Sequence, residues 1–256
     1  MKRLAMLGIL HVWREVLSWS GAWWFAATLV ANETIGPLIG VFVWSEVFPQ
    51  DPRVATYYVA LLAVQLMTAS YEPHTFSERI YEGTISHDLL KPQPILIAPL
   101  GTNVAIRTWL VMIGLPLLIL ASFALDVSYT WIDLAVALPA VLMASLLRFF
   151  FSWLLALAAF WTERVHAVSS FGWVMIFLLG GSAAPVVFLP EPIRSVAEAL
   201  PFRAMLGFPA ELATGTLTLA QGIQGYAWQL GWTAVFGLLV LWVWNAGVRR
   251  FTAVGG

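Results

Sequence analysis

The sequence predicts an all-α protein that crosses a membrane six times, and its composition supports this fold class. Of the 256 residues, 60% are hydrophobic and only 11% are charged, and the mean hydropathy is +0.82. A soluble domain is about 45–50% apolar and about 25% charged. One soluble core could not bury this much apolar surface. The 14 tryptophans agree with a membrane protein, because indole rings favour the membrane–water boundary.

The first 18 residues predict an amphipathic helix. At about 100° per residue, Arg3, His11 and Arg14 share one face, while Ile9 and Trp13 lie on the other. Such a helix lies along the membrane interface rather than across the bilayer. Charged residues interrupt the apolar run, so the segment does not resemble a cleavable signal. A charged extension of the first span is the alternative interpretation.

Six apolar segments have the length of about 20 residues that a membrane-spanning helix needs. They cover residues 21–43, 54–73, 96–122, 132–160, 168–189 and 226–248 of one domain, 1–256. Such long continuous stretches argue against a β-barrel.

Lysine and arginine residues in the loops predict the orientation. Nine of these basic residues lie on the same side as the termini: Lys2, Arg3, Arg14, Arg79, Lys91, Arg107, Arg164, Arg249 and Arg250. On the other side lie three: Arg53, Arg194 and Arg203. We therefore expect both termini to be cytoplasmic.

The longest connection on the predicted cytoplasmic side covers residues 71–94. It predicts a short helix over 75–82 that Gly83 ends, followed by a second turn before Pro92. This charged element is large enough to dock on a soluble partner.

The connection on the other side, residues 190–225, is too long for a plain turn. It predicts an amphipathic helix over 193–200, followed by an apolar stretch at 202–213. Because that stretch is too short to span, we expect a re-entrant or interfacial segment that packs against the bundle.

The sequence contains no recognisable catalytic or metal site. There is no cysteine, and the two lysines, Lys2 and Lys91, do not lie in a phosphate-binding G-x-x-x-x-G-K-[ST] motif. The four histidines have no short metal-binding spacing, and there is no G-x-S-x-G motif. We assign no catalytic residue, metal or cofactor to this chain.

Among the charged residues within predicted spans we single out two, Glu33 in the first span and Arg148 in the fourth. An ionisable group at bilayer depth is costly and normally faces protein or a water-filled cavity. Glu33 could line a translocation path, form a structural pair with Arg148, or lie nearer the surface. For Arg148 we favour a structural role.

Four segments distributed along the chain carry a family resemblance. Residues 78–94 (ERIYEGTISHDLLKPQP) are similar to a loop of the form R-x-I-x-x-G-x-I-x-x-x-L-L-x-P. The other three are 160–173 (FWTERVHAVSSFGW), 200–215 (LPFRAMLGFPAELATG) and 249–256 (RRFTAVGG). In their order and positions these segments resemble the permease subunits of type-2 ATP-binding-cassette (ABC) transporters. The resemblance is to the six-span exporter subgroup whose ATPase is a separate polypeptide.

The resemblance implies that this chain is a translocation subunit and not an enzyme. It implies an N-terminal connecting helix, a coupling helix within about 75–90 and re-entrant helices at 190–215. It also implies two copies of an ATPase subunit that bind ATP and Mg, and a second permease subunit, identical or homologous. The implied location is the bacterial cytoplasmic (inner) membrane.

Under this resemblance the loop at 71–94 docks on the ATPase. The polar contacts would come from Glu78, Arg79, Glu82, His87 and Asp88, while Ile80, Ile85, Leu89 and Leu90 would seat the coupling helix. Glu163 and Arg164 would add a second cytoplasmic contact, or form only a local ion pair of little energetic value. A solvated loop that contacts nothing is the alternative.

The function expected from these features is export of an amphipathic or hydrophobic small molecule or lipid-like cargo. An intramembrane enzyme is one alternative, but it would need a nucleophile and a base at a readable spacing. A non-transporting assembly or regulatory subunit is the other. A neighbouring gene with a Walker motif, or an ATPase that co-purifies, would favour the transporter.

Overall fold

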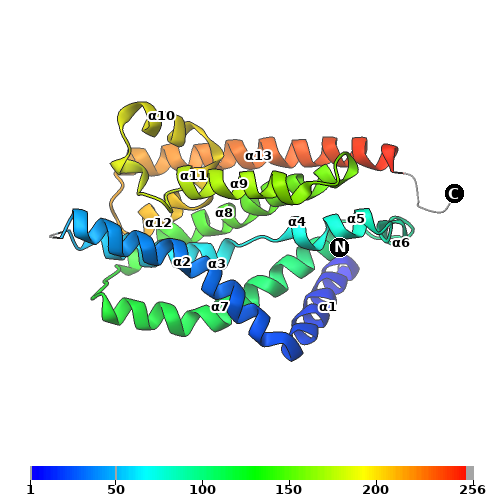
Figure 1. Cartoon of the computed structure of the whole chain (residues 1–256), viewed down its shortest axis with the longest axis horizontal. Coiled ribbons are helices and arrows are strands. Elements are labelled where there is room, and N and C mark those ends of the chain that lie inside the picture. The colour runs from blue at the N-terminus through cyan, green and yellow to red at the C-terminus, as the bar shows by residue number, and fades with distance from the viewer. Residues whose placement is uncertain (1, 50, 252–256) are drawn as a thin grey trace.

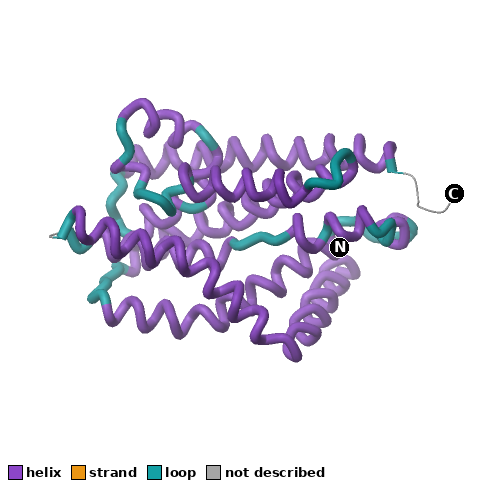
Figure 2. Tube along the Cα trace, viewed as in Figure 1, coloured by secondary structure: helices purple, strands orange, loops and turns teal. Residues whose placement is uncertain are grey.

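Long helices that run side by side form the body of the protein (Figure 1). The computed structural model describes residues 2–49 and 51–251, and within these residues it contains helices and loops but no strand (Figure 2). In this described part, five helical segments are long and apolar enough to cross a membrane. The prediction of an all-α polytopic membrane protein is confirmed, whereas the exact number of spans stays a prediction.

The body consists of six helices. They are α2 (Trp23–Val47), α3 (Arg53–Thr68), α7 (Ile97–Ala124), α8 (Trp131–Leu157), α9 (Val165–Leu179) and α13 (Leu219–Arg250). We call the end of the body near α10 (Glu191–Ala199) the α10 end. The opposite end carries α5 (Ser77–Tyr81) and α6 (Ile85–Leu89) and is called the α6 end (Figure 1).

Helix α8 lies at the centre of the packing, against α13, α3 and α12 (Gly207–Ala213). Ala137, Ala140 and Ala144 are buried along α8, and such small side chains let neighbouring helices approach closely. The helix begins after Thr130, whose side chain accepts a hydrogen bond from the backbone N–H of Asp133. It continues into a 3-10 turn, η2, which agrees with the span predicted at 132–160.

The predicted N-terminal helix is present as α1 (Lys2–Trp19), which lies obliquely against α7 (Figure 1). The indole N–H of Trp109 donates to the carbonyl of Val16 over 3.1 Å. The ring of His11 packs where a side chain on Gly101 would stand. A 3-10 turn, η1, then joins α1 to α2. The predicted helix is thus present, and its amphipathic role at the membrane interface stays a prediction.

The span predicted at 54–73 is interrupted, because α3 ends at Thr68 and a short helix, α4 (Glu72–Thr75), follows three residues later. In a continuous helix the ring of Pro73 would clash with the carbonyl of Ala69, four residues earlier. Pro73 also has no backbone N–H that could donate a hydrogen bond to that carbonyl. The carbonyl of Ala69 instead accepts a hydrogen bond from the Nε of Arg107 over 2.8 Å. The proline therefore explains the break, and an arginine from α7 satisfies the freed backbone.

The span predicted at 168–189 is also shorter than expected. Helix α9 has 15 residues, or about 22 Å at 1.5 Å per residue, against a hydrocarbon core of about 30 Å. After it the chain turns at Gly181, which has a φ of +98°. The side chains of Tyr57 and Trp44 donate to the carbonyls of Gly181 and Ala183 over 3.0 and 2.9 Å. These bonds satisfy non-helical backbone inside the bundle, as a membrane protein requires.

The re-entrant segment predicted at 202–213 forms two short helices, α11 (Pro201–Met205) and α12. Every residue of α12 is buried, and the helix packs against α3 and α8. The last helix, α13, begins earlier than the predicted residue 226. Thr218 and Gln221 form a capping box at its start, which extends the helix by seven residues, from 226 to 219.

Candidate functional site

The loop predicted to dock on a partner folds over the α6 end of α8 as α4, α5 and α6. The single helix expected at 75–82 is divided between α4 and α5. Gly83 follows α5 with a φ of +71°, in the left-handed region that favours glycine. The chain therefore reverses at Gly83, as predicted, and presents α6 as a separate short helix.

Three apolar residues anchor this loop to the body of the protein. Phe76, Ile80 and Ile85 are buried in a cluster that includes Trp153 of α8 and Val240 of α13. The sequence analysis expected Ile80 and Ile85 to seat the loop on another chain. The structure places both against this chain's own helices, so the loop is fixed to the two helices at the centre of the bundle.

An acidic side chain connects α5 to the segment after α6. The carboxylate of Asp88 is buried and lies 3.0 Å from a guanidinium nitrogen of Arg79 and 2.7 Å from the amine of Lys91. Asp88 and Arg79 were expected to contact a partner, but their charges are paired within the loop. This pairing holds α6 in place relative to α5.

The remaining predicted contact residues face outward. Glu78, Glu82 and His87 are exposed, and the side chains of Leu89 and Leu90 are 39% and 83% exposed. Leu89 and Leu90 are neighbours in the chain, so they form a small exposed apolar surface beside charged residues.

The second predicted contact lies beside the first. The hydroxyl of Tyr81 in α5 donates to the carbonyl of Thr162 over 2.9 Å, and the rings of His74 and His166 stack with centroids 5.1 Å apart. Glu163 and Arg164 are both exposed. Within the described residues they form no ion pair with each other, so both charges face outward.

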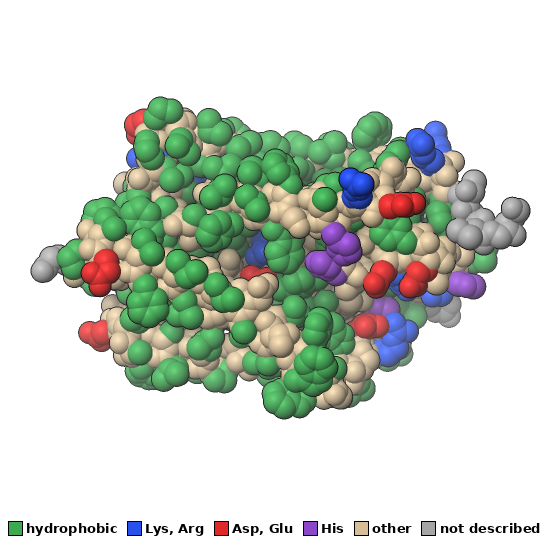
Figure 3. All heavy atoms as spheres, viewed as in Figure 1, with side chains coloured by type: hydrophobic (Ala, Val, Ile, Leu, Met, Phe, Trp, Pro, Cys, Tyr) green, Lys and Arg blue, Asp and Glu red, His purple; other side chains and the backbone are tan. Residues whose placement is uncertain are grey.

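We call the outward-facing residues at this end the docking surface. It consists of Glu78, Glu82, His87, Leu89, Leu90, Glu163 and Arg164. In Figure 3 charged and histidine side chains gather at this end of the molecule, while hydrophobic side chains cover most of the visible body. The docking surface therefore combines charged and imidazole side chains with two exposed leucines.

A buried polar network lies directly behind the docking surface, at the break between α3 and α4. Arg107 donates to the carbonyls of Thr68 and Ala69 over 3.0 and 2.8 Å and to the hydroxyl of Ser70 over 2.7 Å. It also donates to the side chain and the carbonyl of Ser145 in α8. One guanidinium group thus connects α7 and α8 to the residues that precede the loop at 71–94, which we call the docking loop.

Other residues extend this network. Arg148 donates to the hydroxyl of Thr68 over 2.9 Å. The amide of Asn103 donates to the carboxylate of Glu72 over 2.5 Å, which ties α7 to the first residue of α4.

The comparison with known families agrees with this geometry. Residues 50–255 match the family model described as "ABC-2 family transporter protein". The chain belongs to the ABC-2 transporter family. No curated protein and no solved structure matches the chain. The protein is therefore a membrane permease of the ABC type, a kind of transport subunit that works with an ATPase.

In this ABC-2 permease, Glu33 is buried and accepts a hydrogen bond from the hydroxyl of Tyr71 over 2.8 Å. Arg148 bonds to Thr68 instead, and no Glu33–Arg148 ion pair is present among the described residues. Glu33 therefore holds the residue from which the docking loop starts. Its predicted position on a translocation path is a separate matter and stays a prediction.

The loop position predicted for Arg107 was wrong. This arginine was counted with the charges of the cytoplasmic loops, but it lies within α7 and bonds to the interior of the permease. A signal was present, since Arg107 stands in a long apolar run just as Arg148 does. Without Arg107 the count is eight against three, which still favours the same orientation.

Proposed function

We propose that this ABC-2 permease exports an amphipathic or hydrophobic cargo, with energy from a separately encoded ATPase that binds the docking surface. The observation that supports docking most directly is the 83% exposed side chain of Leu90. Leu90 directly follows a helix whose position is set by Asp88. An exposed apolar side chain held in a fixed position among charged residues fits the usual arrangement of an interface, with an apolar core and a polar rim.

The packing supports a route by which movement of the ATPase would reach the membrane helices. The docking loop is joined to α8 and α13 through Phe76, Ile80 and Ile85. It is joined to α7 through Asn103 and to α2 through Tyr71. Because the loop is bonded to four long helices, a displacement at α6 would be carried into the bundle.

A wide apolar cavity supports the choice of cargo. It has a volume of about 770 Å³ between α3, α7 and α8 and is lined mainly by side chains such as Met67, Leu118 and Phe123. An apolar molecule could enter such a space from lipid. We further propose that the complex holds two permease subunits and two ATPase copies in the inner membrane, with the α6 end in the cytoplasm.

The docking proposal is tested by co-purification from cells that express the tagged permease and its ATPase. Leu90→Asp should reduce the ratio of ATPase to permease by about tenfold, because a charge in an apolar contact costs more than about 1.4 kcal/mol. The matched control is Leu219→Asp, at the α10 end, where the leucine is also 83% exposed. This control should leave the ratio unchanged.

Retention of the ATPase by Leu90→Asp, and also by the double variant with Leu89→Asp, would refute docking at this surface. Loss of the ATPase in both Leu90→Asp and Leu219→Asp would refute it as well, because the effect would not be local.

A further inference from the structure

A second cavity lies at the α10 end, away from the docking surface. Its volume is about 340 Å³, within the range of about 300–1,000 Å³ that is common for small-molecule sites. Its walls come from the start of α3, from the segment after α9, from α10 to α12 and from the first turns of α13. Part of this wall is the re-entrant segment, which thus encloses a space besides covering α3 and α8.

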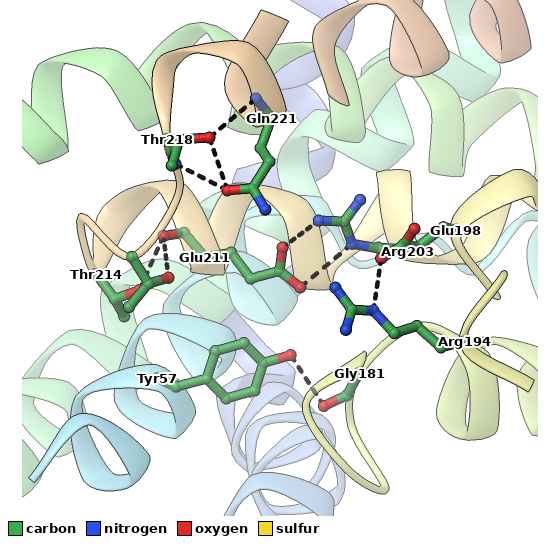
Figure 4. Close-up of polar contacts among 10 residues, drawn as sticks. Tyr57, Gly181, Arg194, Glu198, Arg203, Glu211, Thr214, Thr218 and Gln221 are labelled. Atoms are coloured by element: carbon green, nitrogen blue, oxygen red, sulfur yellow. Dashed lines mark hydrogen bonds and ion pairs between the residues drawn. The ribbon is translucent and has the colours of Figure 1, made fainter. Parts of the chain in front are cut away.

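Three arginine–carboxylate pairs line the cavity. In one pair Arg203 donates to both oxygens of Glu211, over 3.3 and 2.5 Å. In the others, Arg194 donates to Glu198 over 3.0 Å, and Arg53 donates to both oxygens of Asp51 over 2.9 and 2.8 Å. Figure 4 shows the guanidinium groups of Arg194 and Arg203 close to the carboxylate of Glu211.

Both members of the central pair, Arg203 and Glu211, are mostly buried. Burial by itself would lower the pKa of Arg203, but the charge and hydrogen bond of Glu211 outweigh it and raise the pKa. At the rim, the hydrogen bond from Arg53 lowers the pKa of Asp51. The cavity therefore presents fixed positive and negative charges in equal number.

Some polar groups on the wall keep bonding capacity for a ligand. In Arg194 the Nε bonds to Glu198, and the Nη1 lies 3.7 Å from Glu191. The Nη2 of the same guanidinium group has no partner among the described residues. The side-chain oxygen of Gln221 is used in the capping box, which leaves its amide N–H groups free (Figure 4).

The rest of the wall is apolar. Phe188, Leu217 and Trp228 line the same cavity as the ion pairs, and Trp228 is 40% exposed. A ligand must therefore combine a polar group with an apolar part.

The balance of charge selects the kind of polar group. A purely anionic group would approach three carboxylates, and a purely cationic group would approach three arginines; like charges brought together in this way are unfavourable. A group that carries one charge of each sign can bind an arginine and a carboxylate at the same time.

We propose that this cavity binds an amphiphile with a zwitterionic phosphate–amine head group. The phosphate would bind between Arg194 and Arg203, and the amine would bind Glu198 or Glu211. The apolar part would lie on Trp228, Leu217 and Phe188. This site goes beyond the proposed function, because it lies at the opposite end from the docking surface and needs no ATPase.

The test is native mass spectrometry of the purified full-length permease in detergent, with lysophospholipids added. Lysophosphatidylethanolamine should bind about tenfold more tightly than the anionic lysophosphatidylglycerol. Free phosphoethanolamine should bind about tenfold more weakly than the lysolipid, since it lacks the apolar part. If lysophosphatidylglycerol binds equally or more tightly, the claim that the head group is zwitterionic is refuted. If phosphoethanolamine binds as tightly as the lysolipid, the claim that the ligand is an amphiphile is refuted.

Variants locate the binding. Arg194→Gln and Glu198→Gln should each weaken binding of lysophosphatidylethanolamine by about tenfold. Arg249→Gln, which changes an exposed arginine at the end of α13, should leave it unchanged. If an ion-pair variant does not elute as a folded protein, Trp228→Leu takes its place, because it keeps all the charges and removes only the ring. The proposal would be overturned if Trp228→Leu binds lysophosphatidylethanolamine as the unaltered permease does and a folded ion-pair variant does so as well.

Discussion

Replacing Arg107 by leucine should destabilise the permease, because this guanidinium group bonds to the backbone where α3 is interrupted. The leucine would remove the bonds to the carbonyls of Thr68 and Ala69, at 3.0 and 2.8 Å, and those to Ser70 and Ser145. No water is expected at this depth to replace them.

The magnitude follows from the number of bonds. Hydrogen bonds inside membrane proteins contribute on average about 0.6 kcal/mol and at most about 1.7 kcal/mol each. The two backbone carbonyls alone therefore correspond to about 1–3 kcal/mol. For a protein of this size, about 1 kcal/mol shifts the melting temperature by about 2–4 °C. We expect Arg107→Leu to melt about 2–12 °C lower than the unaltered permease.

The assay is thermal unfolding in detergent, followed by size-exclusion chromatography. The melting temperature of Arg107→Lys should lie between those of Arg107→Leu and the unaltered permease. A lysine amine cannot bond to both carbonyls as the planar guanidinium group does. Arg249→Leu, which changes an exposed arginine at the end of α13, is the control and should melt within about 1 °C of the unaltered protein. Equal melting temperatures for Arg107→Leu and Arg249→Leu would refute the proposed role of Arg107.

Four further predictions concern the docking loop and its attachment. Gly83→Ala should lower the free energy of unfolding by about 1 kcal/mol, because the φ of +71° at this position disfavours a side chain. The same thermal assay measures this loss, and an unchanged free energy of unfolding would show that the backbone of the turn adapts to alanine. Asp88→Asn should speed amide hydrogen exchange in α6, since it weakens the pairs to Arg79 and Lys91, and unchanged exchange would contradict the assigned contact. Tyr71→Phe should destabilise by about 1–3 kcal/mol, because it leaves a buried carboxylate without its donor. Glu33→Gln retains an acceptor and should assemble normally, and unchanged transport in that variant would remove Glu33 from the translocation path.

Several features of the permease follow from the sequence alone because they depend on local or additive properties. Composition establishes the membrane environment, since apolar content adds up residue by residue. The turn at Gly83 is predictable because it needs only a glycine in the left-handed region. The short helices at 190–215 follow from the length of the apolar stretch, which is too short to span.

Other features depend on distant partners. The sequence predicts a continuous span at 54–73, but Pro73 breaks it, and Arg107, which is 38 residues from Ala69 in the chain, satisfies the freed carbonyl. The surroundings of Glu33 were likewise undecided until the fold brought Tyr71 to it from 38 residues away. A polar group within an apolar run indicates only that a partner is needed.

The docking loop shows the same division most clearly. Its place in the chain, its charges and its glycine turn are evident in residues 71–94. Which side chains remain free for a partner is decided by the tertiary structure, which buries Ile80, Ile85 and Asp88 and exposes Leu90. The physical reason is that a loop in contact with a bundle first satisfies its own apolar surface and buried charge, and the residues left over form the interaction surface.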